Sequence, residues 1–103
     1  MPTEVMDASI FPTLDTVYRQ GEASIQLFPI QAILLVLTSI YDDTGSIEIT
    51  GVNDEMTSQT VKNYQRIFGQ EPTGEIDIEF WDYLTALYRC NVTGARFRPE
   101  AAL

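Results

Sequence analysis

Apolar residues recur every three or four positions in three segments of the chain, which is the spacing of one buried helix face. The pattern predicts helices over residues 27–41, 55–68 and 78–89. The first is the most apolar, which favours a central position. The predicted core positions are, helix by helix, Ile30, Ile33, Leu34, Leu37, Ile40 and Tyr41; Val61, Tyr64 and Phe68; and Phe80 or Trp81, Leu84, Leu87 and Tyr88.

Residues suited to helix ends stand at the borders of these segments. Pro29 fits only the first turn of a helix, where its missing N–H needs no partner, so the first N-cap is expected near Gln26. Asp54 and Asp77 precede the second and third helices as N-caps. Gly69 follows the second helix and suits a left-handed C-terminal position.

The connections between the helices are short and polar. Isoleucines alternate with polar residues over 47–49, as in a very short strand, and this segment could pair with residues 74–76. We therefore expect a mainly α fold, a compact three-helix bundle with either a short two-stranded β ribbon or irregular loops.

A chain of 103 residues fits one domain. Residues 1–24 lack sustained periodicity and are expected to form an N-terminal arm, extended or with one short turn. Residues 25–90 hold the helical domain, and residues 91–103 are expected to form an irregular tail. We find no second domain and no full internal repeat.

The net charge is −9, from 15 acidic against 6 basic residues, and this charge repels nucleic acid and anionic membrane surfaces. Neutral glycans and basic proteins remain possible partners. The apolar run over residues 30–40 is shorter than the ~20 residues of a membrane span, so no membrane insertion is expected. The first 14 residues lack the basic and apolar regions of a signal peptide.

Catalytic patterns are missing. The chain has no histidine, and its one cysteine, Cys90, has no histidine to activate it. Phosphate-binding and zinc-binding spacings are absent. The acidic groups are explained as caps and turn formers, such as Asp77 at a helix start. We therefore expect no enzyme activity, no cofactor and no metal.

A set of motifs runs through most of the chain in a fixed order. It begins with Gly21 ten residues before Gln31, continues with Thr50, Gly51, Val52, Thr57, Val61, Tyr64 and Gln65, and ends with Thr73, Gly74, Ile76, Asp77, Trp81 and Leu84. Over residues 18–88 this order resembles the peptidoglycan-binding-like domain family. The chain departs from the family pattern at Ser24, which replaces a glycine, at Thr50, which replaces an Asp, and at Asn53-Asp54, which replaces Phe-Gly.

The resemblance implies a three-helix module without catalysis that binds peptidoglycan through its stem peptide or glycan. Such a module would anchor or target a partner, such as a cell-wall hydrolase or coat protein, to the wall. It would work at the cell wall, the spore envelope or outside the cell. The expected ligand-binding residues around the loop that ends at Asp54 are Thr50, Asn53, Asp54 and Thr57. Tyr41 is added to them because an exposed aromatic ring can stack on the C–H face of a sugar.

Gln31 and Gln65 lie on apolar helix faces, where a buried amide usually bonds loop backbone rather than ligand.

As an alternative function, the same fold could be a protein–protein interaction module that has lost wall binding. The protein would be a monomer or a weak dimer, and a basic protein partner would suit its charge.

Overall fold

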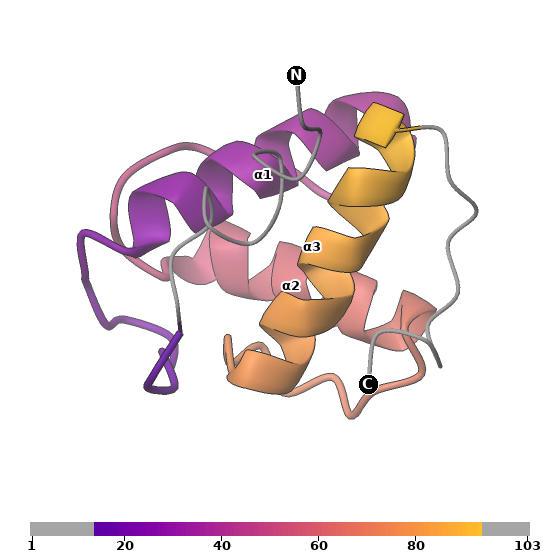
Figure 1. Cartoon of the computed structure of the whole chain (residues 1–103). Helices are drawn as coiled ribbons and strands as arrows, with labels where there is room; N and C mark the ends of the chain where they lie inside the picture. The colour runs from indigo at the N-terminus through magenta and orange to yellow at the C-terminus, as the bar shows by residue number, and fades with distance from the viewer. Residues whose placement is uncertain (1–13, 94–103) are drawn as a thin grey trace, which may run out of the picture.

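The computed structural model describes residues 14–93 and contains three α-helices in that range. They are α1 (Leu27–Ile40), α2 (Glu55–Ile67) and α3 (Ile78–Thr93) (Figure 1). The mainly α, three-helix prediction is confirmed. α3 continues to Thr93, so residues 91–93, expected in the tail, are helical. Residues 1–13 of the expected arm and 94–103 of the tail lie outside the described residues, and the domain division stays a prediction.

The helix ends form as their residues predict. The Asp54 carboxylate accepts the backbone N–H of Thr57 at 2.8 Å, and Asp77 accepts that of Phe80 at 2.8 Å. These two bonds satisfy donors that a helix N-terminus leaves free. Gly69 follows α2 with φ +77°, the left-handed conformation that glycine adopts without strain. Local sequence therefore sets where α2 begins and ends.

The predicted ribbon between residues 47–49 and 74–76 does not form, and residues 14–93 contain no sheet. Residue Ile76 forms an isolated antiparallel bridge with Tyr18, through N–H···O bonds of 3.0 and 2.9 Å. A second isolated bridge joins Ala23 to Val52. The N-terminal segment takes the place of the predicted partner of Ile76, and the side chain of Ile47 is buried in the core.

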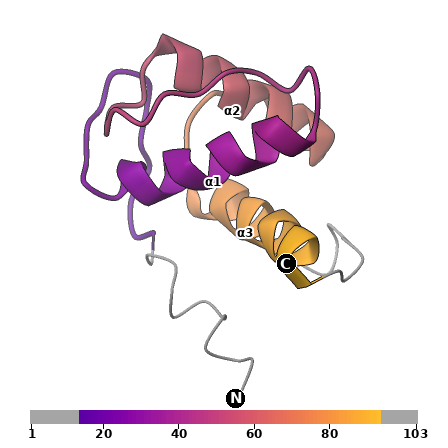
Figure 2. The ribbon, with the colours of Figure 1, turned by 90° about the horizontal axis from the view of Figure 1, so that it is seen from above.

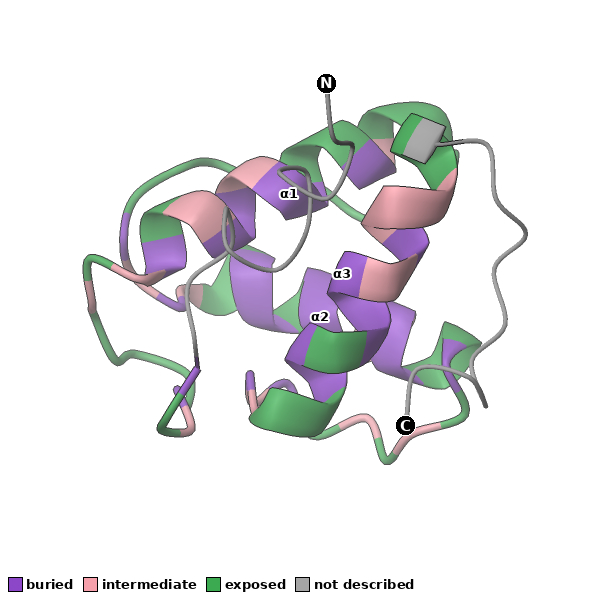
Figure 3. Cartoon of the chain, viewed as in Figure 1, coloured by how far each residue is buried: buried purple, intermediate pink, exposed green. Residues whose placement is uncertain are grey.

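The core lies between the three helices and is closed on one side by the N-terminal segment (Figure 3). Phe68, at the end of α2, has ring centroids of Phe80 and Tyr83 at 5.9 and 5.4 Å, spacings typical of favourable aromatic pairs. Leu14, which precedes the first helix, is also buried in this core. The fully buried apolar side chains are Leu27, Ile30, Leu34, Leu37, Val61, Tyr64, Ile76, Phe80 and Leu84.

The C-terminal end of α1 departs from the predicted core. Ile40 and Tyr41 were expected on the buried face, yet their side chains are 49% and 38% exposed. Tyr41 no longer belongs to the helix, and its hydroxyl reaches Asn91 of α3 instead. After Tyr41 the chain turns and runs back beside α1 toward the start of α2 (Figure 2). The last turn of α1 therefore extends past the core, although its apolar residues keep the spacing of a buried helix face.

Candidate functional site

The buried side chain of Gln31, in α1, holds the loop that precedes α2. Its Oε1 accepts the backbone N–H groups of Thr50 and Gly51, each at 2.9 Å. Its Nε2 donates to the carbonyl of Val52 and to the hydroxyl of Thr57, again at 2.9 Å in both cases. A buried amide whose donors and acceptor are satisfied by this loop and by the first turn of α2 fixes the shape of the loop and its position on the helix. The expected structural role of Gln31 is confirmed.

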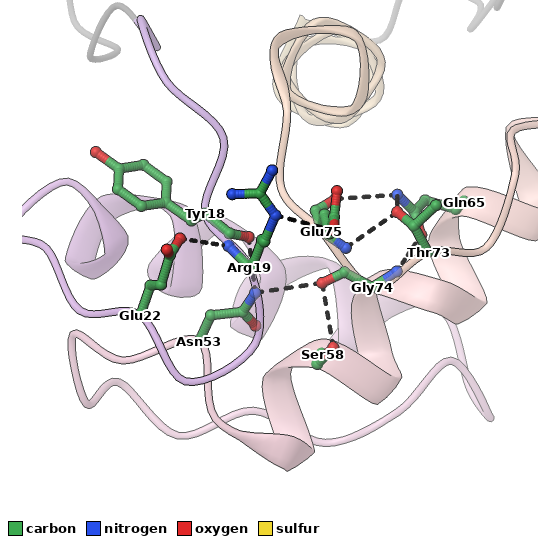
Figure 4. Close-up of polar contacts among 9 residues, drawn as sticks. All are labelled: Tyr18, Arg19, Glu22, Asn53, Ser58, Gln65, Thr73, Gly74 and Glu75. Carbon is green, nitrogen blue, oxygen red and sulfur yellow. Dashed lines mark hydrogen bonds and ion pairs between the residues drawn. The ribbon is translucent and has the colours of Figure 1, made fainter.

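Gln65, in α2, holds the loop before α3 in a similar way. Its Oε1 accepts the N–H of Gly74 at 2.9 Å, and its Nε2 donates to the carbonyl of Glu75 at 3.0 Å (Figure 4). Gly51 and Gly74 have nearly equal φ angles, +77° and +78°, and each follows a threonine and precedes an aspartate N-cap by three residues. The two loops therefore share one arrangement, in which a buried glutamine holds a Thr-Gly turn before an aspartate N-cap. The sequence alone did not indicate this as a repeat.

Asn53 joins three segments of the chain. Its Nδ2 donates to the carbonyl of Tyr18 at 3.0 Å and to that of Gly74 at 3.2 Å (Figure 4). The hydroxyl of Ser58 also donates to the Gly74 carbonyl, at 3.1 Å. The Asn53 side chain is fully buried, and within residues 14–93 its Oδ1 has no hydrogen-bond partner. Asn53 thus ties the N-terminal segment and both loops together.

Two of the five expected ligand-binding residues do not reach the surface. Asn53 and Thr57 are both fully buried, and each bonds groups of the fold itself. The expectation that they present polar groups to a ligand is therefore corrected. Asn53 is buried where it bonds Tyr18 of the N-terminal segment, and Thr57 is buried where it bonds Gln31 of α1. No local pattern in the sequence indicates either contact.

Thr50 and Asp54 do meet solvent, and they lie side by side. The hydroxyl of Thr50 donates to Oδ2 of Asp54 at 3.1 Å, while Oδ1 caps α2 through Thr57. Burial raises the pKa of the Asp54 carboxyl, but the hydrogen bonds from Thr57 and Thr50 outweigh it and leave this pKa below its ordinary value of 3.8. The group is a carboxylate at neutral pH.

Phe28 belongs to the same surface, and sequence analysis missed it. A Cβ placed on Gly51 would lie 2.7 Å from Cζ of Phe28, so the ring rests directly on the loop backbone. The ring is 45% exposed, whereas Gly51 is buried. Phe28 falls outside the apolar stripe that faces the core, and an aromatic residue off that stripe is the one signal that could have pointed to it.

Tyr41 lies apart from this group. It follows Gln31 by ten residues, which corresponds to about 15 Å along a helix axis. Its hydroxyl accepts a hydrogen bond from Nδ2 of Asn91 at 3.0 Å and so links the C-terminal ends of α1 and α3. The structure therefore brings Thr50, Asp54 and Phe28 together and leaves Tyr41 at the opposite end of α1 (Figure 1).

In residues 14–93, His, Cys, Asp and Glu side chains do not gather in groups of three or more that could hold a metal ion. None of the helices in this range has both the length and the apolarity needed to cross a bilayer.

The fold and these loops define a small helical module with a rigid, partly polar surface at the start of α2. The chain belongs to the family described as "Putative peptidoglycan binding domain", whose model matches residues 30–84, just over half of the chain. The match runs from α1 through Leu84 of α3 and includes both glutamine-held loops. Comparisons with curated proteins and with solved structures gave no match.

Proposed function

We propose that this protein is a non-catalytic peptidoglycan-binding module that anchors or targets a partner to the bacterial cell wall. The observation that carries the proposal is the family match over residues 30–84, together with the intact support of the loop inside it. Gln31 holds that loop through three hydrogen bonds of 2.9 Å and the first turn of α2 through a fourth, so the surface of the loop is pre-organised. A pre-organised surface loses little conformational entropy on binding.

The binding surface that we propose consists of Phe28, Thr50 and Asp54. The exposed ring of Phe28 offers an apolar face to the C–H side of a sugar ring. The Thr50 hydroxyl can bond a glycan hydroxyl or amide, and the Asp54 carboxylate accepts N–H and O–H donors. Because Asp54 is negative, the surface favours the amide and ammonium groups of a stem peptide over its carboxylates.

The test is co-sedimentation of the protein with insoluble peptidoglycan sacculi, at low and moderate salt, with soluble muropeptide as competitor. We expect pelleting that tolerates salt and is competed by muropeptide. Phe28→Ala should weaken it several-fold. Ile78→Ala is the matched control, since Ile78 is a 57% exposed apolar residue at the start of α3. Tyr41→Phe should pellet like the parent protein, because Tyr41 lies outside the proposed surface.

The results separate the possibilities. Equal pelleting of the Phe28→Ala and Ile78→Ala proteins would remove the proposed surface while leaving wall binding intact. A protein that stays in the supernatant under all conditions would contradict wall binding itself.

The alternative is an interaction module on the same fold that binds a protein instead of the wall. The net charge of −9 favours it, since such a charge suits a basic protein better than an acidic wall polymer. Sacculi that fail to pellet the protein at any salt concentration would select this alternative.

A further inference from the structure

α1 presents apolar side chains to solvent as well as to the core. Leu35, Val36 and Ile40 are 43%, 43% and 49% exposed, and we call these three residues the outer face of α1. Leu35 and Val36 lie on the side of the helix away from Leu34 and Leu37, which are fully buried, and Ile40 lies at the edge of that side, in the last turn of α1. Figure 3 shows exposed segments in the C-terminal half of α1. Large exposed apolar side chains grouped on one helix face mark an interaction surface.

The helix that carries this face has no charge along its whole length. Residues 25–41 include no Asp, Glu, Lys or Arg. A helix whose only partner is its own core normally carries charged residues on its solvent side. The outer face of α1 therefore has the composition of a side that is covered by another molecule.

The surroundings of the outer face are acidic. Asp42 and Asp43 follow α1 directly and are exposed, and the loop that carries Glu48 runs back beside the helix (Figure 2). Residues 20–61 contain no Lys or Arg. Within the described chain, the basic residues lie outside this stretch: Arg19, Lys62, Arg66 and Arg89. The acidic residues within it are Glu22, Asp42, Asp43, Glu48, Asp54 and Glu55.

This combination of charge and apolarity selects one kind of occupant. A second copy would cover the apolar face but would add a second net charge of −9 and a second acidic border. An anionic lipid surface would be repelled for the same reason. A helix with an apolar stripe flanked by Lys and Arg satisfies both features, because its stripe packs on Leu35, Val36 and Ile40 while its bases approach Asp42 and Asp43.

We propose that the outer face of α1 docks a basic amphipathic helix of a partner protein. Phe28, which belongs to the surface that we propose for peptidoglycan, lies seven residues before Leu35 on the same side of α1, so the two proposed surfaces adjoin. The two proposals are tested by different probes, peptides for docking and sacculi for wall binding.

The experiment uses the whole chain and three synthetic 18-residue peptides. The first has a leucine stripe at helical spacing flanked by lysines, the second has glutamates in place of the lysines, and the third has serines in place of the leucines. Calorimetry measures affinity at two salt concentrations, and amide chemical shifts locate the contact. We expect the first peptide alone to bind, on the order of 10 μM at low salt, with shifts centred on residues 32–43.

Variants test the apolar and the acidic parts separately. Leu35→Gln with Val36→Gln should weaken binding of the lysine peptide about tenfold, as loss of a central apolar contact does. Ile67→Gln with Ile78→Gln is the control, since both isoleucines are exposed apolar residues on the other helices, 56% and 57%. This control should bind like the parent protein.

The charge variants keep the apolar face unchanged. Asp42→Asn with Asp43→Asn should weaken binding about threefold and reduce its dependence on salt. Asn is suited to residue 43, whose φ is +66°. Glu71→Gln with Glu79→Gln removes two exposed acids far along the chain and should bind like the parent protein.

Several outcomes would overturn the proposal. These are no binding of the lysine peptide at low salt, equal binding of the glutamate peptide, or shifts centred away from α1. A dimer in sedimentation equilibrium that Leu35→Gln with Val36→Gln dissociates would assign the face to a second copy. Flotation with phosphatidylcholine vesicles, lost in the same variant, would assign it to lipid.

Discussion

The side-chain oxygen of Gln31 accepts the backbone N–H of Gly51 at 2.9 Å, across twenty residues of sequence. Gly51 has φ +77°, and its carbonyl accepts the N–H of Ser24 at 3.0 Å, so the loop is held from the helix and from the N-terminal segment. The conformation of the loop before α2 therefore depends on α1 and on the N-terminal segment as well as on its own residues.

Replacing Gln31 by Leu should lower the free energy of unfolding by about 2–4 kcal/mol, because loop N–H and C=O groups lose their partners while buried. Urea unfolding followed by circular dichroism measures this. Gln59→Leu is the control, since Gln59 is exposed on α2 and should change stability by less than about 0.5 kcal/mol. Equal losses in the two variants would contradict the role assigned to Gln31.

Gly51→Ala and Gly69→Ala separate backbone strain from steric overlap. Both glycines have φ +77°, but an added Cβ meets nothing within 4 Å at Gly69 and lies 2.7 Å from the Phe28 ring at Gly51. Gly69→Ala should cost about 1 kcal/mol of strain, and Gly51→Ala should cost a further ~1–3 kcal/mol of overpacking. Thermal unfolding of both variants checks the difference. The double variant with Phe28→Ala should recover part of the stability that Gly51→Ala loses. If it does not, steric overlap with the Phe28 ring is not the cause of that loss.

Asn53→Ala should act on stability and leave wall binding unchanged. It removes two buried hydrogen bonds, to Tyr18 and Gly74, and exposes no binding group, so we expect a loss of about 2–3 kcal/mol. Sacculi pelleting should then match that of the parent protein at temperatures where both are folded. A several-fold drop in pelleting of the folded variant would return Asn53 to the binding surface.

Asp54 should contribute to the pH dependence of stability. The pKa of its carboxyl in the folded protein lies below the ordinary value of 3.8, so the folded state binds the proton less tightly than the unfolded state. The stabilisation is therefore complete above about pH 5 and is lost as the pH falls through about 3.8 and below. Asp54→Asn retains a capping oxygen without the charge, so its stability should fall less between pH 6 and pH 3. Equal falls in the two proteins, measured by urea unfolding at each pH, would contradict this prediction.

The local features of the fold could be read from single residues and their neighbours. Asp54 and Asp77 cap helices, and Gly69 ends one, as the sequence predicts, because each acts on backbone within a few residues. The three helices could be found because their apolar period is local as well. The family pattern added the loop around Gly51, which the match to residues 30–84 supports.

The candidate site could be predicted only in part. Thr50 and Asp54 meet solvent at the loop as expected, while Asn53 and Thr57 between and beside them are buried. All four are polar residues at the start of one helix, and composition cannot tell which of them will be covered by distant parts of the chain, such as Tyr18 over Asn53 and Gln31 over Thr57. Phe28 joined the surface because its ring rests on Gly51, a contact between residues far apart in the chain.

By itself, the sequence determined that this protein forms three helices, where α2 and α3 begin, and that its family is one of binding modules. Only the tertiary structure decided that Tyr18 pairs with Ile76, that Asn53 is buried and that Ile40 is exposed. Helix period and capping are interactions between near neighbours, which any window of sequence contains. Burial and loop pairing depend on which distant segment packs against a residue, and that is settled only when the whole chain folds.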